Sequence, residues 1–175
     1  MKKVKEKIVY TIGHSTRTLP EFIQILNTYD INYVVDIRTV PKSRHNPQYN
    51  SAHLEKILKK HNIYYYHFTE LGGFRHAQKD SVNIAWRNAS FRGYADYMQT
   101  KDFNNAIDTL LKIVAKYQVV LMCAEAVPWR CHRSLIGDAL LARNIHVMNI
   151  FDAQHAKPHT LTPWAYVEGH HITYP

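Results

Sequence analysis

Cysteine is scarce in this chain, and long apolar runs are missing. Two cysteines among 175 residues cannot form a disulfide framework, so we expect free thiols, metal ligands or nucleophiles. No segment approaches the roughly 18 consecutive apolar residues that a membrane-spanning helix requires. The charged stretch 1–7 also lacks the apolar core of a signal peptide. The sequence therefore predicts a cytoplasmic protein that does not associate with membranes.

Internal repeats and low-complexity linkers are absent too, which favours a single domain spanning 1–175. A chain of this length buries a sizeable core without support from metals or disulfides. The formal net charge is +8 and the isoelectric point is about 9.5. This charge favours anionic partners, either small phosphorylated molecules or nucleic acid. The sequence carries no signal for an oligomeric state.

Short apolar segments alternate with amphipathic ones along the chain. We expect strands at 8–12, 33–37, 63–68, 119–122 and 146–150, and helices at 19–29, 51–60, 94–98, 103–117 and 134–143. Such alternation predicts a three-layer α/β fold with a central, mainly parallel sheet of about five strands and helices on both faces. Residues 70–93 show no convincing period, which is typical of functional or mobile segments. The tail from about residue 152 is expected to be irregular.

Polar motifs follow three of the expected strands. Gly13-His14-Ser15 follows the first strand, the segment from Asp36 to Arg44 ends the second, and Cys123-Ala124-Glu125 follows the fourth. Because ligands of parallel sheets bind outside the carboxyl ends of the strands, we expect one polar site at this edge. Each residue also has a structural alternative. His14 can cap its turn, Asp36 can be a buried carboxylate satisfied by Arg38, and the arginines can be solvated surface charges.

Both cysteines lie in the stretch 119–134, which reads as a strand, a Pro-containing loop and a helix start. Cys131 precedes the helix beside Arg133, where the helix dipole and the guanidinium lower a thiol pKa and attract anions. We therefore expect Cys131 to be the reactive thiol and Cys123, at the end of an apolar strand, to be buried. Cysteine-dependent phosphatases have a similar loop with five residues between Cys and Arg. Six residues separate Cys123 from Arg130, so the match fails.

Five spaced motifs occur in one order along the chain: Thr11 to Ser15; Val35 to Arg38 with Pro41, Ser43 and Arg44; Leu71 to Gly73; Phe91 to Met98; and Cys123 to Glu125 followed by Cys131 to Arg133. Together they resemble the family catalogued as domain of unknown function 488, over about residues 8–150. The resemblance implies a compact, cytoplasmic, mostly prokaryotic α/β domain. It implies no reaction, and it does not extend into the tail after Phe151.

Three functional hypotheses fit these residues. The favoured one is an enzyme, a hydrolase or phosphoryl-transfer enzyme, that acts on a phosphorylated or nucleic-acid-like anion at the carboxyl edge of the sheet. Its candidate catalytic residues are Cys131, His14, Asp36 and Glu125, and its candidate substrate-binding residues are Ser15, Arg38, Ser43, Arg44, Arg92, Tyr94 and Arg133.

The second hypothesis is a zinc or iron site whose ligands are Cys123, Glu125, Cys131 and His132. The third is a non-catalytic nucleic-acid-binding module that uses the positive net charge. No recognised nucleic-acid motif supports the third hypothesis, and the polar groups converge more than a phosphate-tracking surface requires.

Overall fold

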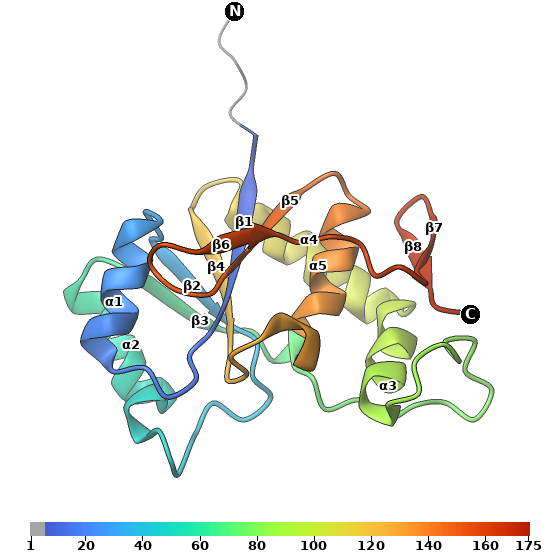
Figure 1. Cartoon of the computed structure of the whole chain (residues 1–175), viewed down its shortest axis with the longest axis horizontal. Coiled ribbons are helices and arrows are strands. Elements are labelled where there is room, and N and C mark those ends of the chain that lie inside the picture. The colour runs from blue at the N-terminus through green and yellow to red at the C-terminus, as the bar shows by residue number, and fades with distance from the viewer. Residues whose placement is uncertain (1–5) are drawn as a thin grey trace, which may run out of the picture.

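A computed structural model describes residues 6–175 and shows a six-stranded sheet with helices packed on both faces (Figure 1). The spatial order of the strands is β3-β2-β4-β1-β5-β6. Their bounds are β1 Ile8–Gly13, β2 Tyr33–Asp36, β3 Tyr64–His67, β4 Val119–Cys123, β5 His146–Ile150 and β6 Ala156–Pro158. The first five strands are parallel, and β6 runs antiparallel to β5. The expected three-layer α/β fold is confirmed. The charged residues 1–5 lie outside the described part.

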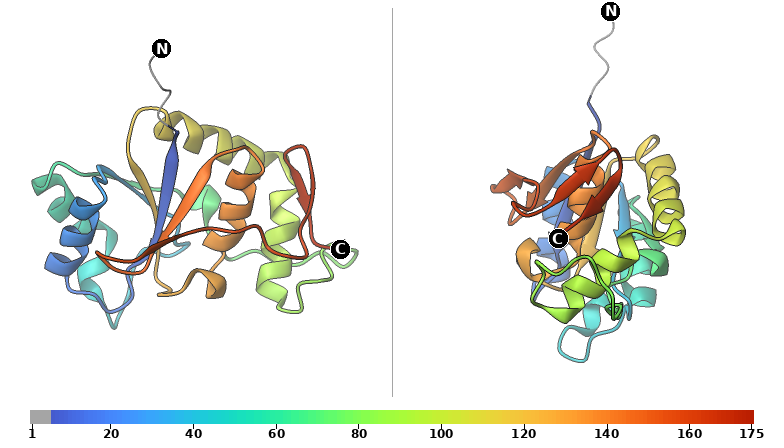
Figure 2. Two further views of the ribbon diagram at one scale, coloured as in Figure 1. Left: turned by 45° about the horizontal axis from the view of Figure 1, so that its top comes forward. Right: turned by 90° about the vertical axis from the view of Figure 1, so that its right-hand side faces the viewer.

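Five helices cover the sheet: α1 Leu19–Thr28, α2 Ser51–Lys60, α3 Ala89–Met98, α4 Lys101–Val114 and α5 Arg133–Leu141. Buried residues of α1 and α2 form one hydrophobic core, and those of α3, α4 and α5 form a second one on the opposite face. In the right-hand view of Figure 2, α4 and the C-terminal segment lie on opposite sides of the molecule. Within residues 6–175, no helix combines the length and the apolar character that a membrane crossing demands.

Strand β4 explains why two separate cores exist. Its residues are all buried, and they alternate between the two faces of the sheet. Val120 and Met122 pack with α1 and α2, whereas Leu121 and Cys123 pack with the other three helices. A strand covered on both faces needs a continuous apolar run, which this segment has. The pleat therefore directs the Cys123 thiol toward the side of the sheet that α5 covers.

Side-chain caps set the starts of α1, α3 and α4. Thr18 accepts a hydrogen bond from the Glu21 N–H at the start of α1. Asn88 accepts hydrogen bonds from the backbone N–H groups of the first turn of α3, so this helix begins at Ala89. The expected start at Tyr94 was wrong, because the Asn88 cap precedes the apolar pattern by a full turn.

The segment between β3 and α3 is organised by one carboxylate. Asp96, on α3, accepts hydrogen bonds from the Gln78 N–H at 2.8 Å, the Ser81 hydroxyl at 2.5 Å and the Asn83 side-chain amide at 2.7 Å. These bonds come from residues 13 to 18 positions earlier in the chain. Hydrophobic periodicity does not indicate contacts between residues so far apart in sequence. The conformation of this segment therefore could not be predicted from the sequence pattern.

We expected an irregular C-terminal tail, and this expectation was wrong. It contributes β6 to the sheet and a separate hairpin of β7 (Tyr166–Glu168) and β8 (His171–Thr173). Gly169 supplies the left-handed conformation at the hairpin turn, with φ of 63°. Tyr174 is buried, and its hydroxyl donates to Asp138 at 2.7 Å. Three-residue strands are too short to show an alternating pattern, and tertiary burial holds them in place.

Candidate functional site

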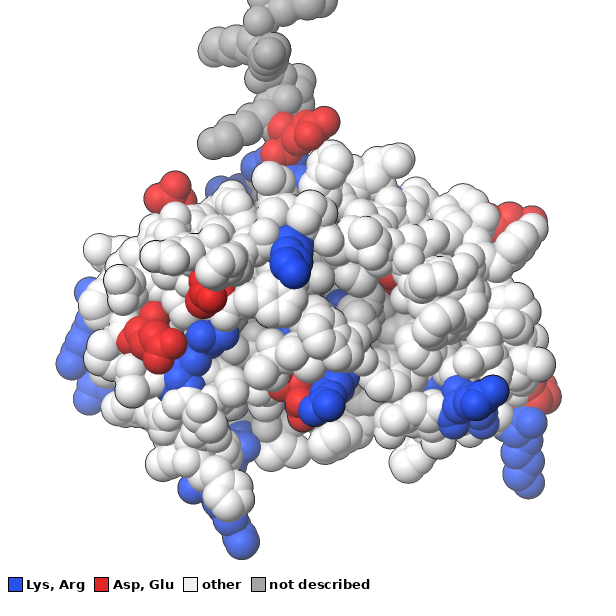
Figure 3. All heavy atoms as spheres, viewed as in Figure 1, with Lys and Arg blue, Asp and Glu red and all other residues white. Residues whose placement is uncertain are grey.

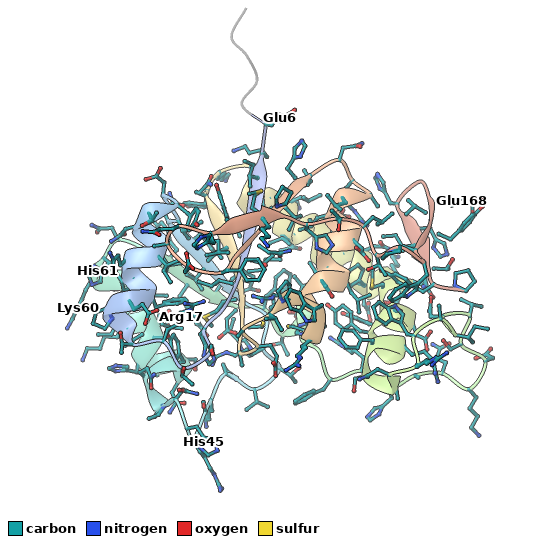
Figure 4. The ribbon with its side chains drawn as sticks, in the orientation of Figure 1. Glu6, Arg17, His45, Lys60, His61 and Glu168 are labelled. Carbon is teal, nitrogen blue, oxygen red and sulfur yellow. The ribbon has the colours of Figure 1, made fainter. Side chains whose placement is uncertain are left out.

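Three loops meet at the carboxyl ends of the adjacent strands β2, β4 and β1, and they enclose a hollow of about 360 Å³. We call it the thiol pocket. The loop after β2 forms one wall and projects from the body of the molecule, as His45 in Figure 4 indicates. The lining residues are His14, Arg38, Thr39, Val40, Lys42, Ser43, Gly73, Phe74, Cys123, Ala124, Glu125, Cys131 and His132.

The loop after β4 is fastened to the end of β1. Gly13 pairs in register with Cys123, and the His14 N–H donates to the Cys123 carbonyl at 2.8 Å. A Cβ atom on Gly13 would lie 1.6 Å from the Glu125 carbonyl oxygen. Only glycine therefore permits this approach, and it fixes the loop that carries the cysteines.

The two thiols are buried and in contact with each other. Cys123 is 3% exposed, Cys131 is 6% exposed, and the Cys131 S–H donates to the Cys123 sulfur at 3.0 Å. Burial alone would raise the pKa of the Cys123 thiol, but this donated bond and the charge of Arg133 lower it below its ordinary value. The same bond, together with burial, raises the pKa of Cys131 well above its ordinary value. Cys123 is thus favoured as the thiolate, which corrects the expectation for Cys131.

Arg133 brings a positive charge to the base of the loop and has no carboxylate partner within residues 6–175. The side chain is 1% exposed, and one terminal nitrogen donates to the Ala126 carbonyl at 3.1 Å. Its Nε and Nη1 atoms are buried and find no partner among the described residues. A buried cation is strongly destabilising unless an anion compensates it. The charge of Arg133 favours ionisation of both neighbouring thiols, but at Cys131 burial and the hydrogen bond to Cys123 outweigh it.

His132 has a defined tautomer. Its Nε2 lies 3.0 Å from the Ile37 carbonyl oxygen, which can only accept, so Nε2 carries the hydrogen. Its Nδ1 therefore holds a lone pair, 3.6 Å from the Cys131 sulfur. Burial lowers the pKa of His132 to about 4, so the ring is neutral near pH 7. A Cβ on Gly73 would lie 2.6 Å from Nδ1, and glycine is needed there for the ring to fit.

The predicted catalytic residue Asp36 does not line the pocket. It is fully buried, and its carboxylate oxygens accept from Arg38 Nε at 2.9 Å and Arg38 Nη2 at 2.6 Å. The Tyr65 hydroxyl also donates to it, at 2.5 Å. Asp36 therefore holds Arg38 at the pocket wall. With both oxygens occupied, it has no free lone pair facing a substrate.

His14 reaches the pocket, but both of its ring nitrogens are engaged. Nδ1–H donates to the Ser15 carbonyl at 2.8 Å, and Nε2 accepts from Arg38 at 3.4 Å. The ring stacks on Tyr49 with centroids 4.1 Å apart. Burial lowers the pKa of His14 to about 4, and the charge of Arg38 acts in the same direction. His14 is thus a neutral wall of the pocket that positions Arg38.

Of the other predicted site residues, Ser43 and Glu125 line the pocket and four do not. The Ser15 N–H donates to the Ala124 carbonyl, and Arg44 is exposed on the loop after β2. Arg92 donates to the Trp86 carbonyl at 3.0 Å, and the buried Tyr94 donates to the Leu71 carbonyl at 3.0 Å. Arg92 and Tyr94 therefore bind backbone carbonyl groups and do not face the pocket.

The predicted metal ligands do not form a cluster. Across residues 6–175, no group of three or more His, Cys, Asp or Glu side chains is arranged to hold a metal ion. Cys123, Cys131 and His132 adjoin one another, whereas Glu125 is exposed. On the face drawn in Figure 3, basic side chains are interspersed with acidic and uncharged ones and do not merge into one stripe.

The family model described as Domain of unknown function DUF488 matches residues 18–140. The chain belongs to this family. Within the DUF488 match lie the loop after β2 and both cysteines, whereas His14 precedes it. No match was found among curated proteins or among solved structures.

Sequence reasoning missed several pocket residues of this DUF488 chain. Thr39, Val40 and Lys42 belong to the loop after β2, and Gly73 and Phe74 reach the pocket from the segment after β3. The Gly72-Gly73 pair was the available signal, because two adjacent glycines permit a close backbone approach. A Cβ on Gly72 would lie 2.8 Å from the Thr39 hydroxyl oxygen. The pair therefore lets this segment pack on the loop after β2.

Proposed function

We propose that this protein is a thiol-dependent enzyme that transfers the phosphoryl group of a small phosphorylated anion, with Cys123 as the nucleophile. The supporting observation is the buried Arg133 guanidinium, which has no carboxylate partner and lies beside a thiol with a lowered pKa. A thiolate in such a position is both the missing counterion and an activated nucleophile.

The pocket favours a small substrate. Its volume of about 360 Å³ is near the lower end of the range for small-molecule sites. Lys42 is exposed at the wall and supplies a free cation for phosphate oxygens, since Arg38 is committed to Asp36. Phe74 is exposed beside it and offers apolar surface for the rest of the substrate.

The residues support a two-step transfer. The Cys123 thiolate attacks phosphorus, an S–P bond forms, and the P–O bond to the leaving group breaks. The leaving oxygen takes the proton of the Cys131 thiol. Water then cleaves the S–P bond, which releases phosphate, regenerates the Cys123 thiolate and returns one proton to Cys131. The neutral His132, whose Nδ1 lies 3.6 Å from the Cys131 sulfur, packs against that thiol.

The test is turnover of a small phosphomonoester such as p-nitrophenyl phosphate, with acid quenching and mass spectrometry of the covalent adduct. Cys123→Ser is expected to abolish both turnover and adduct. Cys131→Ser is the matched control, and we expect it to keep the adduct on Cys123 while turnover slows. Full activity in Cys123→Ser, or an adduct on Cys131, would contradict the proposal.

The sulfur–sulfur distance of 3.0 Å supports a second candidate function, peroxide reduction by the dithiol. The Cys123 thiolate would cleave the O–O bond of hydrogen peroxide to give a sulfenic acid and hydroxide. Cys131 would then displace the sulfenic oxygen as water and close a disulfide. One equivalent of peroxide should remove two hydrogen masses from the wild-type protein and leave a sulfenic acid in Cys131→Ser. Peroxide consumption without any phosphoryl adduct would favour this candidate over the first.

A further inference from the structure

A second hollow, of about 380 Å³, lies on the other side of the loop after β4 from the thiol pocket. All three tryptophans of the chain line it. We call it the tryptophan groove and define it by Trp86, Trp129, Phe151, Lys157, His159 and Trp164. Residues 123–125 of the loop face the thiol pocket, whereas Pro128 and Trp129 face the groove.

The aromatic walls are open to solvent. Trp129 is 64% exposed and Trp164 is 46% exposed, although indole rings contribute most when they are buried. Trp164 meets Trp86 edge-on with centroids 5.2 Å apart, and Trp129 lies 6.3 Å from Phe151 at 40°. The two exposed rings thus each adjoin another aromatic ring while much of their surface stays free. Exposed, fixed aromatic rings around a hollow are typical of a binding site for a flat ligand.

The floor of the groove is polar and held by a buried chain of hydrogen bonds. The His159 side chain is 8% exposed, and its Nε2–H donates to Asp138 at 2.9 Å. Its Nδ1 accepts from Asn149 at 3.5 Å, and the Asn149 oxygen accepts from Thr11 at 2.6 Å. A Cβ on Gly137 would lie 2.8 Å from the His159 ring. The floor is therefore rigid before any ligand arrives.

The polar groups at the groove suit an acceptor-rich anion. Lys157 is the charged lining residue, its ammonium lies 5.8 Å from the Phe151 ring centroid, and no carboxylate lines the groove. The Trp86 indole N–H is buried and has no partner among the described residues. The Asn149 amide uses one of its two hydrogens on His159. This set disfavours a cationic guest and leaves the Asn149 amide with one hydrogen for an acceptor of the ligand.

We propose that the tryptophan groove binds a nucleoside monophosphate. The base stacks on Trp129, its ring nitrogens and carbonyl oxygens accept from the Asn149 amide, and the phosphate pairs with Lys157. A purine or pyrimidine is flat and rich in acceptors, and the phosphate matches the single cation. The net charge of +8 attracts such an anion over a distance. This site uses none of the thiol chemistry proposed above.

The test is titration of the full chain with AMP, followed by quenching of tryptophan fluorescence, with adenosine in a parallel titration. We expect saturable quenching, with adenosine binding more weakly than AMP. Trp129→Ala should weaken AMP binding roughly tenfold. Lys157→Met should weaken AMP to the level of adenosine without changing adenosine binding. Absence of saturable quenching, or AMP binding that Trp129→Ala leaves unchanged, overturns the proposal.

Two controls make the assignment specific. Lys42→Met removes a lysine from the thiol pocket instead of the groove, and the quenching of tryptophan fluorescence by AMP should be unchanged, because no tryptophan lines the thiol pocket within residues 6–175. Cys123→Ser should also bind AMP normally, so the groove proposal stands even if Cys123 proves inert. Loss of AMP binding in Lys42→Met would place the nucleotide in the thiol pocket and overturn the assignment. Circular dichroism of each variant confirms that the fold is intact.

Discussion

Two arginines are buried near the carboxyl edge of this sheet, and their surroundings differ. Arg38 makes a bidentate ion pair with the buried Asp36, and it also donates to the Tyr49 carbonyl at 2.8 Å. Arg133 has one backbone acceptor, and two of its nitrogens find no partner in residues 6–175. Each guanidinium adjoins a neutral histidine, whose pKa it helps to lower.

The difference separates a charge that the fold pairs from one that it leaves without a carboxylate among the described residues. A buried ion pair with satisfied hydrogen bonds is complete by itself, so Arg38 has little to offer a substrate. An unpaired buried charge must be compensated by a group that can ionise or bind. Together with the hydrogen bond from Cys131, the charge of Arg133 lowers the pKa of the Cys123 thiol, whereas Arg38 shapes the pocket wall.

The largest expected effect comes from breaking the complete pair. Asp36→Ala leaves the Arg38 charge and the Tyr65 hydroxyl without their acceptor. We expect a loss of about 3–5 kcal/mol in the free energy of unfolding, measured by urea denaturation. The double variant Asp36→Ala/Arg38→Met should recover part of this loss. A cost below about 1 kcal/mol for Asp36→Ala would show that solvent reaches this pair.

The two histidines should make stability fall in acid. Their folded pKa values near 4 lie below the ordinary value of 6.5, so the unfolded chain binds more protons between these pH values. Stability is full above pH 6.5 and declines toward pH 4, by up to about 3 kcal/mol for each histidine. Denaturation at stepped pH values measures the slope. His132→Asn should flatten it and His45→Gln, an exposed control, should not.

Removing the unpaired arginine should affect reactivity more than stability. Arg133→Met eliminates an uncompensated buried charge and one hydrogen bond to Ala126, and we expect less than about 1 kcal/mol of change. The pKa of Cys123 should rise, and alkylation by iodoacetamide at pH 7 should slow several-fold. Peptide mapping of the alkylated cysteine gives the measurement. An unchanged rate on Cys123 would mean that Arg133 does not set its acidity.

The smallest effect is expected at the exposed arginine of the loop after β2. Arg44 makes no hydrogen bond or ion pair with the described residues and does not line the pocket. Arg44→Ala should change the free energy of unfolding by no more than about 0.5 kcal/mol and leave phosphomonoester turnover unaltered. A marked loss of turnover would show that Arg44 contributes to the site. The distinction between pocket residues and exposed loop residues would then fail.

The position of the site could be predicted from the sequence because parallel strands carry their loops to the same edge. Gly13, Asp36 and Cys123 each end a strand, and β1, β4 and β2 are neighbours in the sheet. The alternation of apolar strands and helices predicted the layers for the same local reason, since burial on both faces requires continuous apolar strands. The start of α3 and the short strands of the tail were not predicted. A side-chain cap sets the first, and burial against residues far away in the sequence sets the second.

The sequence by itself determined that the ends of three strands, at Gly13, Asp36 and Cys123, gather at this edge, since strand periodicity and loop position are local properties. Only the tertiary structure decided their roles. It paired Asp36 with Arg38 and left Arg133 unpaired, and it set the Cys131 S–H against Cys123 so that the acidic thiol is the one at the strand end. It also brought Trp86, Trp129 and Trp164 from three distant segments around one groove. The ionisation of a side chain and the recognition of a ligand depend on neighbours in space, and the sequence pattern does not show which residues are neighbours.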